Sequence, residues 1–126
     1  RHLALLTLQT PAPGGYGRIL RNPQQQVSGI VEEKDASDEQ KKISEIYSGI
    51  MAVPTRLLRA WLARLMASEP RNAQGEYYLT DVVEVLASAG HSVGSVIAPA
   101  SETAGVNDPL QLAEAEQEML RRNAGL

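Results

Sequence analysis

The chain has 126 residues, of which 43% are hydrophobic and 21% charged, and this composition is typical of one soluble globular domain. Its formal net charge of -3 argues against nucleic-acid binding, which requires a basic face. The absence of cysteine excludes disulfides and thiolate metal sites and fits a cytoplasmic protein. No apolar run reaches the roughly 18 residues that a membrane-spanning helix requires.

Residues 3–8 are almost continuously apolar, which predicts a strand covered on both faces. Because the chain opens directly in this strand, we expect it to be a piece of a longer protein. Prolines and glycines over residues 10–17 predict a loop, and short strands are expected at residues 19–20 and 27–31. Ser37 and Gln40 have the spacing of a capping box, so a short helix is expected over residues 38–44.

In the second half of the chain, strands are again expected to alternate with helices. An apolar repeat predicts an amphipathic helix, and Asp108 followed by Pro109 is typical of a helix start. The expected elements are a buried strand at 49–53, a helix at 55–67, a helix from Thr80 or Asp81 to Gly90, a strand at 93–97 and a helix ending near Arg122. The alternation predicts an α/β fold with a mostly parallel sheet.

One catalytic motif is excluded by its context. Residues 90–94 (Gly-His-Ser-Val-Gly) match the G-x-S-x-G nucleophile elbow of hydrolases. That elbow requires a strand before the serine and a helix after it, whereas here the expected order is reversed. We therefore interpret the segment as a helix-to-strand turn.

Four polar, glycine-marked clusters lie where elements are expected to start or end, which is typical of a site built from loops on a rigid scaffold. They are Gly14-Gly15-Tyr16-Gly17-Arg18, Val31-Glu32-Glu33-Lys34-Asp35, Gly75-Glu76-Tyr77-Tyr78-Leu79-Thr80-Asp81 and Gly105-Val106-Asn107-Asp108.

The first two clusters each have two interpretations. The glycine-rich loop leads into a strand and not into a helix, so it does not fit a phosphate cradle. Its glycines either let the backbone approach a ligand closely or make the loop flexible. We place Glu32 in a strand over residues 27–34, where its carboxylate either accepts hydrogen bonds from sugar hydroxyls or is a solvated strand end beside Lys34.

The last two clusters are equally open. Tyr77 and Tyr78 offer stacking area and hydroxyls, but one of them could simply pack in the core, with Thr80 capping the next helix. Asn107 is either part of a helix cap or an oxygen ligand for magnesium. One neutral ligand cannot hold that ion, so a carboxylate would have to come from elsewhere.

Taken together and in this order, the four clusters resemble the bacterial bifunctional N-acetylglucosamine-1-phosphate uridylyltransferase/glucosamine-1-phosphate acetyltransferase, in the second half of its uridylyltransferase domain. The resemblance covers nearly the whole chain. It implies the C-terminal half of a Rossmann-like nucleotidyltransferase domain, similar to sugar-nucleotide pyrophosphorylases. The implied reaction joins N-acetylglucosamine-1-phosphate to UTP with magnesium, giving UDP-N-acetylglucosamine for cell-wall synthesis and releasing pyrophosphate.

The resemblance also implies roles for individual residues. Gly17 and Glu32 would contact the sugar, and Glu76, Tyr78 and Thr80 would line the same pocket. Asn107 would be a magnesium ligand. No residue is implied as a catalytic nucleophile, because this kind of transfer depends on positioning and charge neutralisation.

The chain departs from the family pattern in three absences and one substitution. The family's phosphate-binding loop and its magnesium aspartate are absent from residues 1–126, as is its hexapeptide-repeat acetyltransferase domain, so we expect a single partial domain that is inactive alone. Tyr47 stands where the family usually has a sugar-binding asparagine. The alternative is a catalytically incompetent sugar-nucleotide-binding or interaction module. Apolar strands left uncovered would favour self-association or pairing with the missing half.

Overall fold

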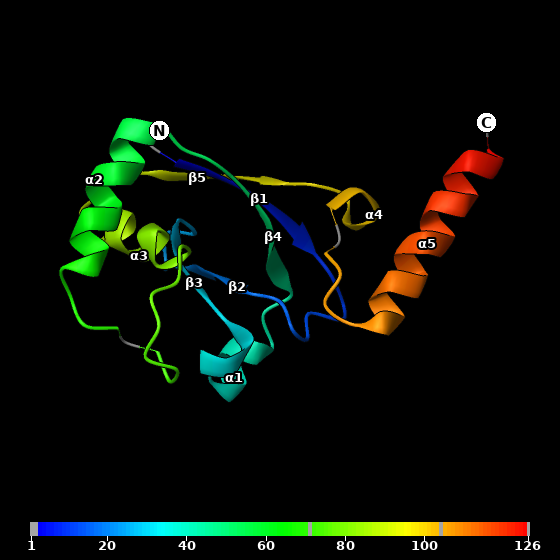
Figure 1. The fold of residues 1–126 in the computed structure, drawn as a ribbon, viewed down its shortest axis with the longest axis horizontal. Helices are drawn as coiled ribbons and strands as arrows, with labels where there is room; N and C mark the ends of the chain where they lie inside the picture. The colour runs from blue at the N-terminus through cyan, green and yellow to red at the C-terminus, as the bar shows by residue number, and fades with distance from the viewer. Residues whose placement is uncertain (1–2, 71, 104, 126) are drawn as a thin grey trace.

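The computed structural model describes residues 3–70, 72–103 and 105–125 of the chain. Strands and helices follow one another along it (Figure 1). The strands are β1 (Leu3–Gln9), β2 (Arg18–Arg21), β3 (Val27–Val31), β4 (Glu45–Ala52) and β5 (Val93–Ile97). The helices are η1, a 3₁₀ turn (Glu33–Asp35), α1 (Asp38–Lys41), α2 (Thr55–Met66), α3 (Asp81–Ser88), α4 (Ala100–Thr103) and α5 (Pro109–Ala124). The α/β class is therefore confirmed.

The strands form one sheet in the order β3-β2-β4-β1-β5. The expectation of a mostly parallel sheet is wrong, because β1 pairs in parallel with β5 but antiparallel with β4, and β2 is antiparallel to both β3 and β4. Connection length explains the difference. The turn between β2 and β3 is too short for the crossover that a parallel pair needs, whereas β5 follows a long segment that contains α2 and α3.

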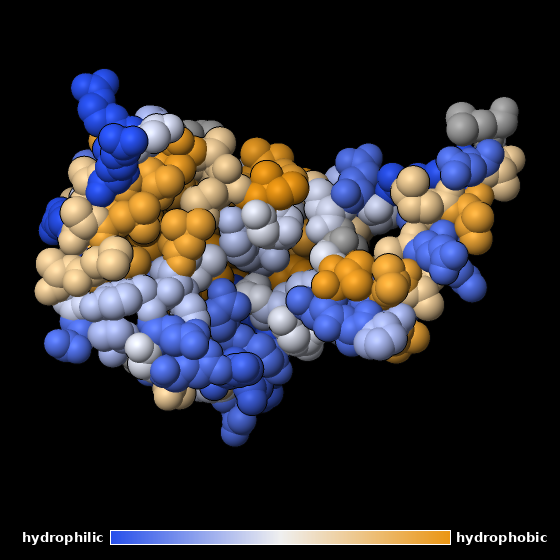
Figure 2. Space-filling view, viewed as in Figure 1, coloured by the Kyte–Doolittle hydropathy of each residue, from blue (hydrophilic) through white to orange (hydrophobic). Residues whose placement is uncertain are grey.

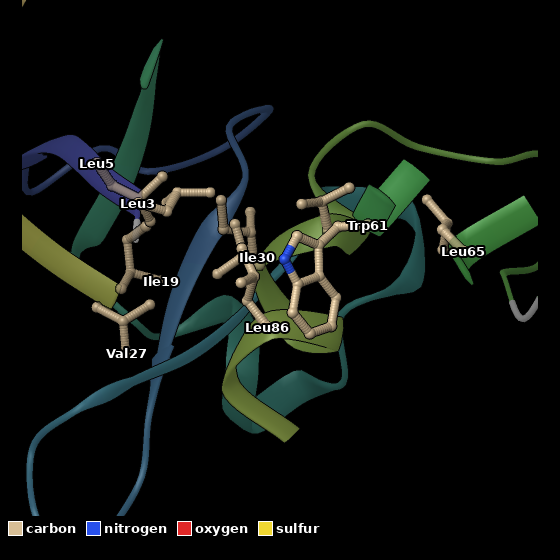
Figure 3. Close-up of a cluster of buried hydrophobic side chains, with 10 residues drawn as sticks. Leu3, Leu5, Ile19, Val27, Ile30, Trp61, Leu65 and Leu86 are labelled. Atoms are coloured by element: carbon tan, nitrogen blue, oxygen red, sulfur yellow. The ribbon is translucent and has the colours of Figure 1, made fainter. Parts of the chain in front are cut away.

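The core lies between the strands and helices α2 and α3. Ten buried side chains of the described residues form it, and Figure 3 shows Trp61 of α2 and Leu86 of α3 meeting Ile30 of β3, with residues of β1 and β2 beyond them. Val82, Val83 and Leu86 are completely buried, because the apolar face of α3 packs against β3 and α2. As expected, β1 is an interior strand, with Leu3 and Leu5 in this core.

Strand β4 differs from the expected buried strand at 49–53. It begins four residues earlier, at Glu45, and its register with β1 shifts so that Leu6 opposes Ile50 while Thr7 opposes Tyr47. Gly49 absorbs this bulge with φ of +90°, a conformation that glycine adopts without strain. Ile50 is 55% exposed, so this end of β4 is not buried.

Polar side chains cross the sheet near its centre. Glu45 is 7% exposed and accepts hydrogen bonds from Thr7 Oγ1 at 2.8 Å and from Arg21 Nε at 2.8 Å. Arg21 also donates to Ser95 Oγ at 3.0 Å. The hydrogen bond from Arg21, supported by the bond from Thr7, holds the pKa of Glu45 below its usual value despite burial. This network joins β1, β2, β4 and β5 through residues that do not belong to the polar clusters.

The helix ends follow the sequence signals. Ser37 and Gln40 form the predicted capping box, although α1 ends at Lys41 rather than at residue 44. Asp108 caps α5 by accepting the N–H of Gln111 at 2.8 Å, and Pro109 takes the first helical position. Helix α5 stands apart from the sheet, and apolar side chains are visible on its surface (Figures 1 and 2). The short helix α4 was not expected.

The G-x-S-x-G match lies between a helix and a strand, as the sequence predicted. Helix α3 ends at Ser88 and β5 starts at Val93, the reverse of a nucleophile elbow. The rings of His91 and Trp61 pack in a T-shaped arrangement with centroids 5.0 Å apart, so His91 contributes to the packing around the core.

Candidate functional site

Gly17 is placed by the start of β2 and lies directly against a carboxylate. Its carbonyl oxygen accepts the backbone N–H of Tyr47 at 2.9 Å, which fixes the end of the glycine-rich loop to β4. A Cβ atom at position 17 would come within 3.0 Å of Ile30 Cγ2 and 3.4 Å of both carboxylate oxygens of Glu32. A side chain at this position would therefore crowd Ile30 and occupy the space directly beside the Glu32 carboxylate, which explains the glycine.

Glu32 lies just beyond the strand in which we expected it. Strand β3 ends at Val31, and the carbonyl of Glu32 accepts the N–H of Asp35 at 3.0 Å as the chain turns into η1. This turn directs the Glu32 carboxylate toward Gly17 on one side and Thr80 on the other. Thr80 Oγ1 donates to Glu32 Oε1 at 3.3 Å.

The structure thus separates the two interpretations of Thr80. It precedes α3 in the helical region of the backbone, and its side chain makes no capping bond. Asp81 instead accepts the N–H of Tyr78 at 3.3 Å. The threonine hydroxyl is therefore available for the hydrogen bond to Glu32, and the capping interpretation is wrong.

Two tyrosines stand near the same carboxylate. Burial raises the pKa of Tyr47 above its usual value, and the negative charge of Glu32 raises it further. The pKa of Tyr78 is also raised, by burial and then by the carboxylates around it, first Asp35 and also Glu32. Tyrosine is ordinarily protonated at neutral pH, and the raised pKa values leave both phenols so; each can therefore donate a hydrogen bond.

The segment that carries Glu76 and Tyr78 is fastened to η1. Asp35 Oδ1 accepts the backbone N–H of Ala73 at 2.9 Å. Within the loop, Asn72 Oδ1 accepts the N–H of Glu76 at 3.0 Å, and the Tyr78 hydroxyl donates to the side chain of Gln74 at 2.8 Å. The side chain of Glu76 is exposed. The loop brings Tyr78 close to Glu32 and leaves the side chain of Glu76 exposed at the edge of the loop.

The fourth cluster is joined to the first. The Tyr16 hydroxyl donates to the carbonyl of Gly105 at 2.6 Å, and a Cβ at Gly105 would lie 3.5 Å from the Tyr16 ring. This contact places the turn that carries Asn107 beside the glycine-rich loop. Asn107 is exposed, and its backbone N–H donates to Gln111 Oε1 at 2.6 Å.

The described residues do not by themselves form a magnesium site. Among them, no three His, Cys, Asp or Glu side chains gather in a way that could hold a metal ion. Asp108, the carboxylate next to Asn107 in sequence, uses Oδ1 to cap α5. Asn107 offers one neutral oxygen, whereas Mg²⁺ takes about six oxygen ligands, usually including a carboxylate.

A cavity of about 460 Å³ lies next to the site rather than in it. It is enclosed by the end of β3, the C-terminal turn of α2, the following loop and α3. Of the expected site residues, Glu32 and Tyr78 line it. Gly17, Tyr47, Thr80 and Asn107 do not line it. Glu32 and Tyr78 therefore lie on the wall of the cavity, whereas the other expected site residues do not.

Two residues beside Gly17 and Glu32 had no predicted role: Arg18 and Glu33. They belong to the first two polar clusters of the sequence, and in the structure they form an ion pair. Arg18 is 2% exposed. Its position immediately after Gly17 and before the apolar pair Ile19-Leu20 was the available signal, because a buried arginine needs a partner.

Comparison with known proteins supports the resemblance inferred from the sequence. No family model matches the chain. The bifunctional protein GlmU of Paracidovorax citrulli is 57% identical over 116 residues, which cover 91% of this chain and 24% of that protein. GlmU of Polaromonas naphthalenivorans is 54% identical over 128 residues, and GlmU of Corynebacterium efficiens 49% identical over 121 residues. These matches cover 98% and 95% of the chain, and 26% and 24% of the relatives.

No helix in the described ranges is both long and apolar enough to cross a membrane.

The predicted resemblance is confirmed by the matches to GlmU proteins. The chain is similar, over almost its entire length, to one segment of bifunctional GlmU proteins, and it spans about a quarter of the length of those relatives.

Proposed function

We propose that the chain supplies the sugar-binding part of an N-acetylglucosamine-1-phosphate uridylyltransferase. The observation that carries this proposal is the position of the Glu32 carboxylate, against the Cα of Gly17 and in hydrogen-bond contact with Thr80. A carboxylate held between a bare stretch of backbone and a hydroxyl is well suited to accept hydrogen bonds from two neighbouring sugar hydroxyls. The similarity to GlmU proteins supports the choice of sugar nucleotide.

In this proposal, each residue has a distinct part. Glu32 accepts hydrogen bonds from the sugar, and the backbone of Gly17 approaches the sugar because no side chain intervenes. Thr80 orients Glu32 and offers its own hydroxyl, while Tyr78 provides an aromatic face and Glu76 lies at the rim. Asn107 contributes one oxygen toward a magnesium ion whose other ligands lie outside the described residues.

Tyr47 is the residue that makes this site unusual. Its backbone is held by Gly17 and its phenol stands near Glu32. Where the family usually has the amide of an asparagine, Tyr47 has a protonated hydroxyl that donates a single hydrogen bond. The tyrosine ring also occupies more space. We propose that Tyr47 contacts the sugar through this hydroxyl.

A graft experiment tests the proposed function. These 126 residues replace the matching segment of the GlmU protein of P. citrulli, and pyrophosphate release is measured with UTP, N-acetylglucosamine-1-phosphate and magnesium. We expect the graft to turn over and the 126-residue chain alone to be slower by orders of magnitude, because transfer requires preorganised charge around the phosphates. A folded graft without turnover that still binds UDP-N-acetylglucosamine indicates the incompetent binding module. Turnover by the isolated chain within tenfold of the graft contradicts the proposal.

We also propose that the isolated chain associates with itself or pairs with the other half of such a domain. Leu6 of β1 lies opposite Ile50 of β4 and Val96 of β5, so the three side chains form a row across the sheet. Ile50 is 55% and Val96 59% exposed, and apolar surface of this kind favours association. Sedimentation from micromolar to millimolar concentration should show association that Val96→Lys weakens. A monomer throughout that range would contradict this.

A further inference from the structure

The two residues that flank the Gly17–Glu32 contact are held by one buried side chain. Arg18 is 2% exposed, and its Nη1 donates to the carbonyl of Tyr16 at 2.6 Å and to the carboxylate of Glu33. Tyr16 directly precedes Gly17, and Glu33 directly follows Glu32. The guanidinium therefore connects the glycine-rich loop to η1 at the point where Gly17 and Glu32 meet.

Further contacts complete this connection. Arg18 Nη2 donates to the carbonyl of Lys41 at the end of α1, at 3.2 Å. The Glu33 carboxylate also accepts the backbone N–H of Gly15, and its hydrogen bond with Arg18 holds its pKa below the usual value. Loop, 3₁₀ turn and α1 are thus joined through a single ion pair.

Packing alone does not explain an arginine at this position. The buried Nε of Arg18 has no hydrogen-bond acceptor among the described residues. A buried methionine of similar length would fill the space without an unsatisfied donor, and apolar replacements of buried ion pairs are often neutral or stabilising. The planar, multi-donor guanidinium instead fits the task of fixing several acceptors at once.

We propose that Arg18, paired with Glu33, is a positioning residue that sets the distance between Gly17 and Glu32 and thereby the affinity for the sugar. Arg18 acts through its neighbours and does not itself contact the sugar. This inference rests on the proposed function for its kinetic consequence, whereas its structural consequence can be measured without any ligand.

The kinetic test uses the graft described above. Arg18→Lys keeps the positive charge but has a point-like ammonium that cannot hold the same three acceptors in one plane. We expect the KM for N-acetylglucosamine-1-phosphate to rise about tenfold or more, because small misplacements of binding groups are costly, while the KM for UTP stays within about twofold. A merely structural role would affect both substrates alike. Glu33→Gln, which changes the more exposed partner, is expected to give the same pattern.

Arg21→Lys is the matched control, because Arg21 forms a comparable ion pair with Glu45 within the sheet and neither residue belongs to the glycine-rich loop or to η1. We expect it to leave both KM values within about twofold of the unchanged graft. Equal KM values for the sugar phosphate in the Arg18→Lys and unchanged grafts, or equal effects of Arg18→Lys and Arg21→Lys, would overturn the proposal.

The second test needs no ligand. The backbone NMR order parameters of Gly15 and Gly17 in the 126-residue chain should be about 0.85. They should fall below about 0.6 in Arg18→Lys but not in Arg21→Lys. Unchanged order parameters would overturn the positioning role. If the unchanged graft has no turnover while these order parameters fall as expected, the proposed function fails and the positioning role stands.

Discussion

Replacing Glu32 with alanine is expected to reduce the affinity of the graft for UDP-N-acetylglucosamine by about tenfold to a hundredfold. Hydrogen bonds to a charged acceptor contribute about 1.5–3 kcal/mol each, and each 1.4 kcal/mol corresponds to about a factor of ten in affinity. Glu32→Gln should lose somewhat less, because the amide keeps one acceptor oxygen. In magnesium-free buffer, Asn107→Ala should change the affinity by less than about threefold, since its proposed role requires the ion. Calorimetric titration measures all three variants.

Glu39→Ala is the control for loss of a carboxylate. Glu39 is on α1 and is highly exposed, paired with Lys42 at 3.1 Å, so its removal should not affect sugar binding. A loss for Asn107→Ala that equals or exceeds the loss for Glu32→Ala would contradict the ranking. Circular dichroism of each variant separates a local effect from unfolding.

The largest expected effect on stability comes from the core. Leu86→Ala should lower the free energy of unfolding by about 2–5 kcal/mol, because a fully buried leucine loses both its transfer free energy and its packing contacts. Leu86 lies on α3 between Ile30 and Trp61, so the cavity would open where the helix meets the sheet and α2 (Figure 3). For a domain of this size, such a loss is a large share of the total stability.

Leu120→Ala is the matched control, since Leu120 is 62% exposed on α5. It should change the free energy of unfolding by no more than about 0.5 kcal/mol. Urea unfolding followed by tryptophan fluorescence reports on both variants, because Trp61 is part of the same core. Equal destabilisation by the two substitutions would show that α3 is not central to the fold.

Local signals predicted most of the elements. The capping box at Ser37, the Asp108-Pro109 helix start and the apolar repeat of α2 are each encoded within a few residues, and the structure contains all three. The direction of strand pairing is not local. Alternation of strands and helices suggested a parallel sheet, but the short β2–β3 turn imposes an antiparallel pair, and β4 also runs antiparallel to β1.

The sequence indicated which residues belong to the candidate site, but it did not indicate which of them contact one another. Glycine, carboxylate and tyrosine residues marked the four clusters. A strand at residues 27–31 was expected, but Glu32 was placed in a strand extended to residue 34, whereas β3 ends at Val31. That ending turns Glu32 toward Thr80, whose side chain makes no capping bond and donates to Glu32 instead. The connection through Arg18 depends on burial, which a single charged residue in a sequence does not reveal.

The most direct test of the site is a map of where UDP-N-acetylglucosamine binds the 126-residue chain. In a ¹⁵N NMR titration, we predict that the largest amide shift changes occur at Gly17, Glu32 and Thr80, with smaller changes at Tyr47 and Tyr78. The far wall of the neighbouring cavity, at Arg64 and Ser88, should remain unchanged. Shifts confined to that far wall, or no saturable shifts at Gly17 and Glu32 at millimolar ligand, would contradict the assignment of these clusters to sugar binding.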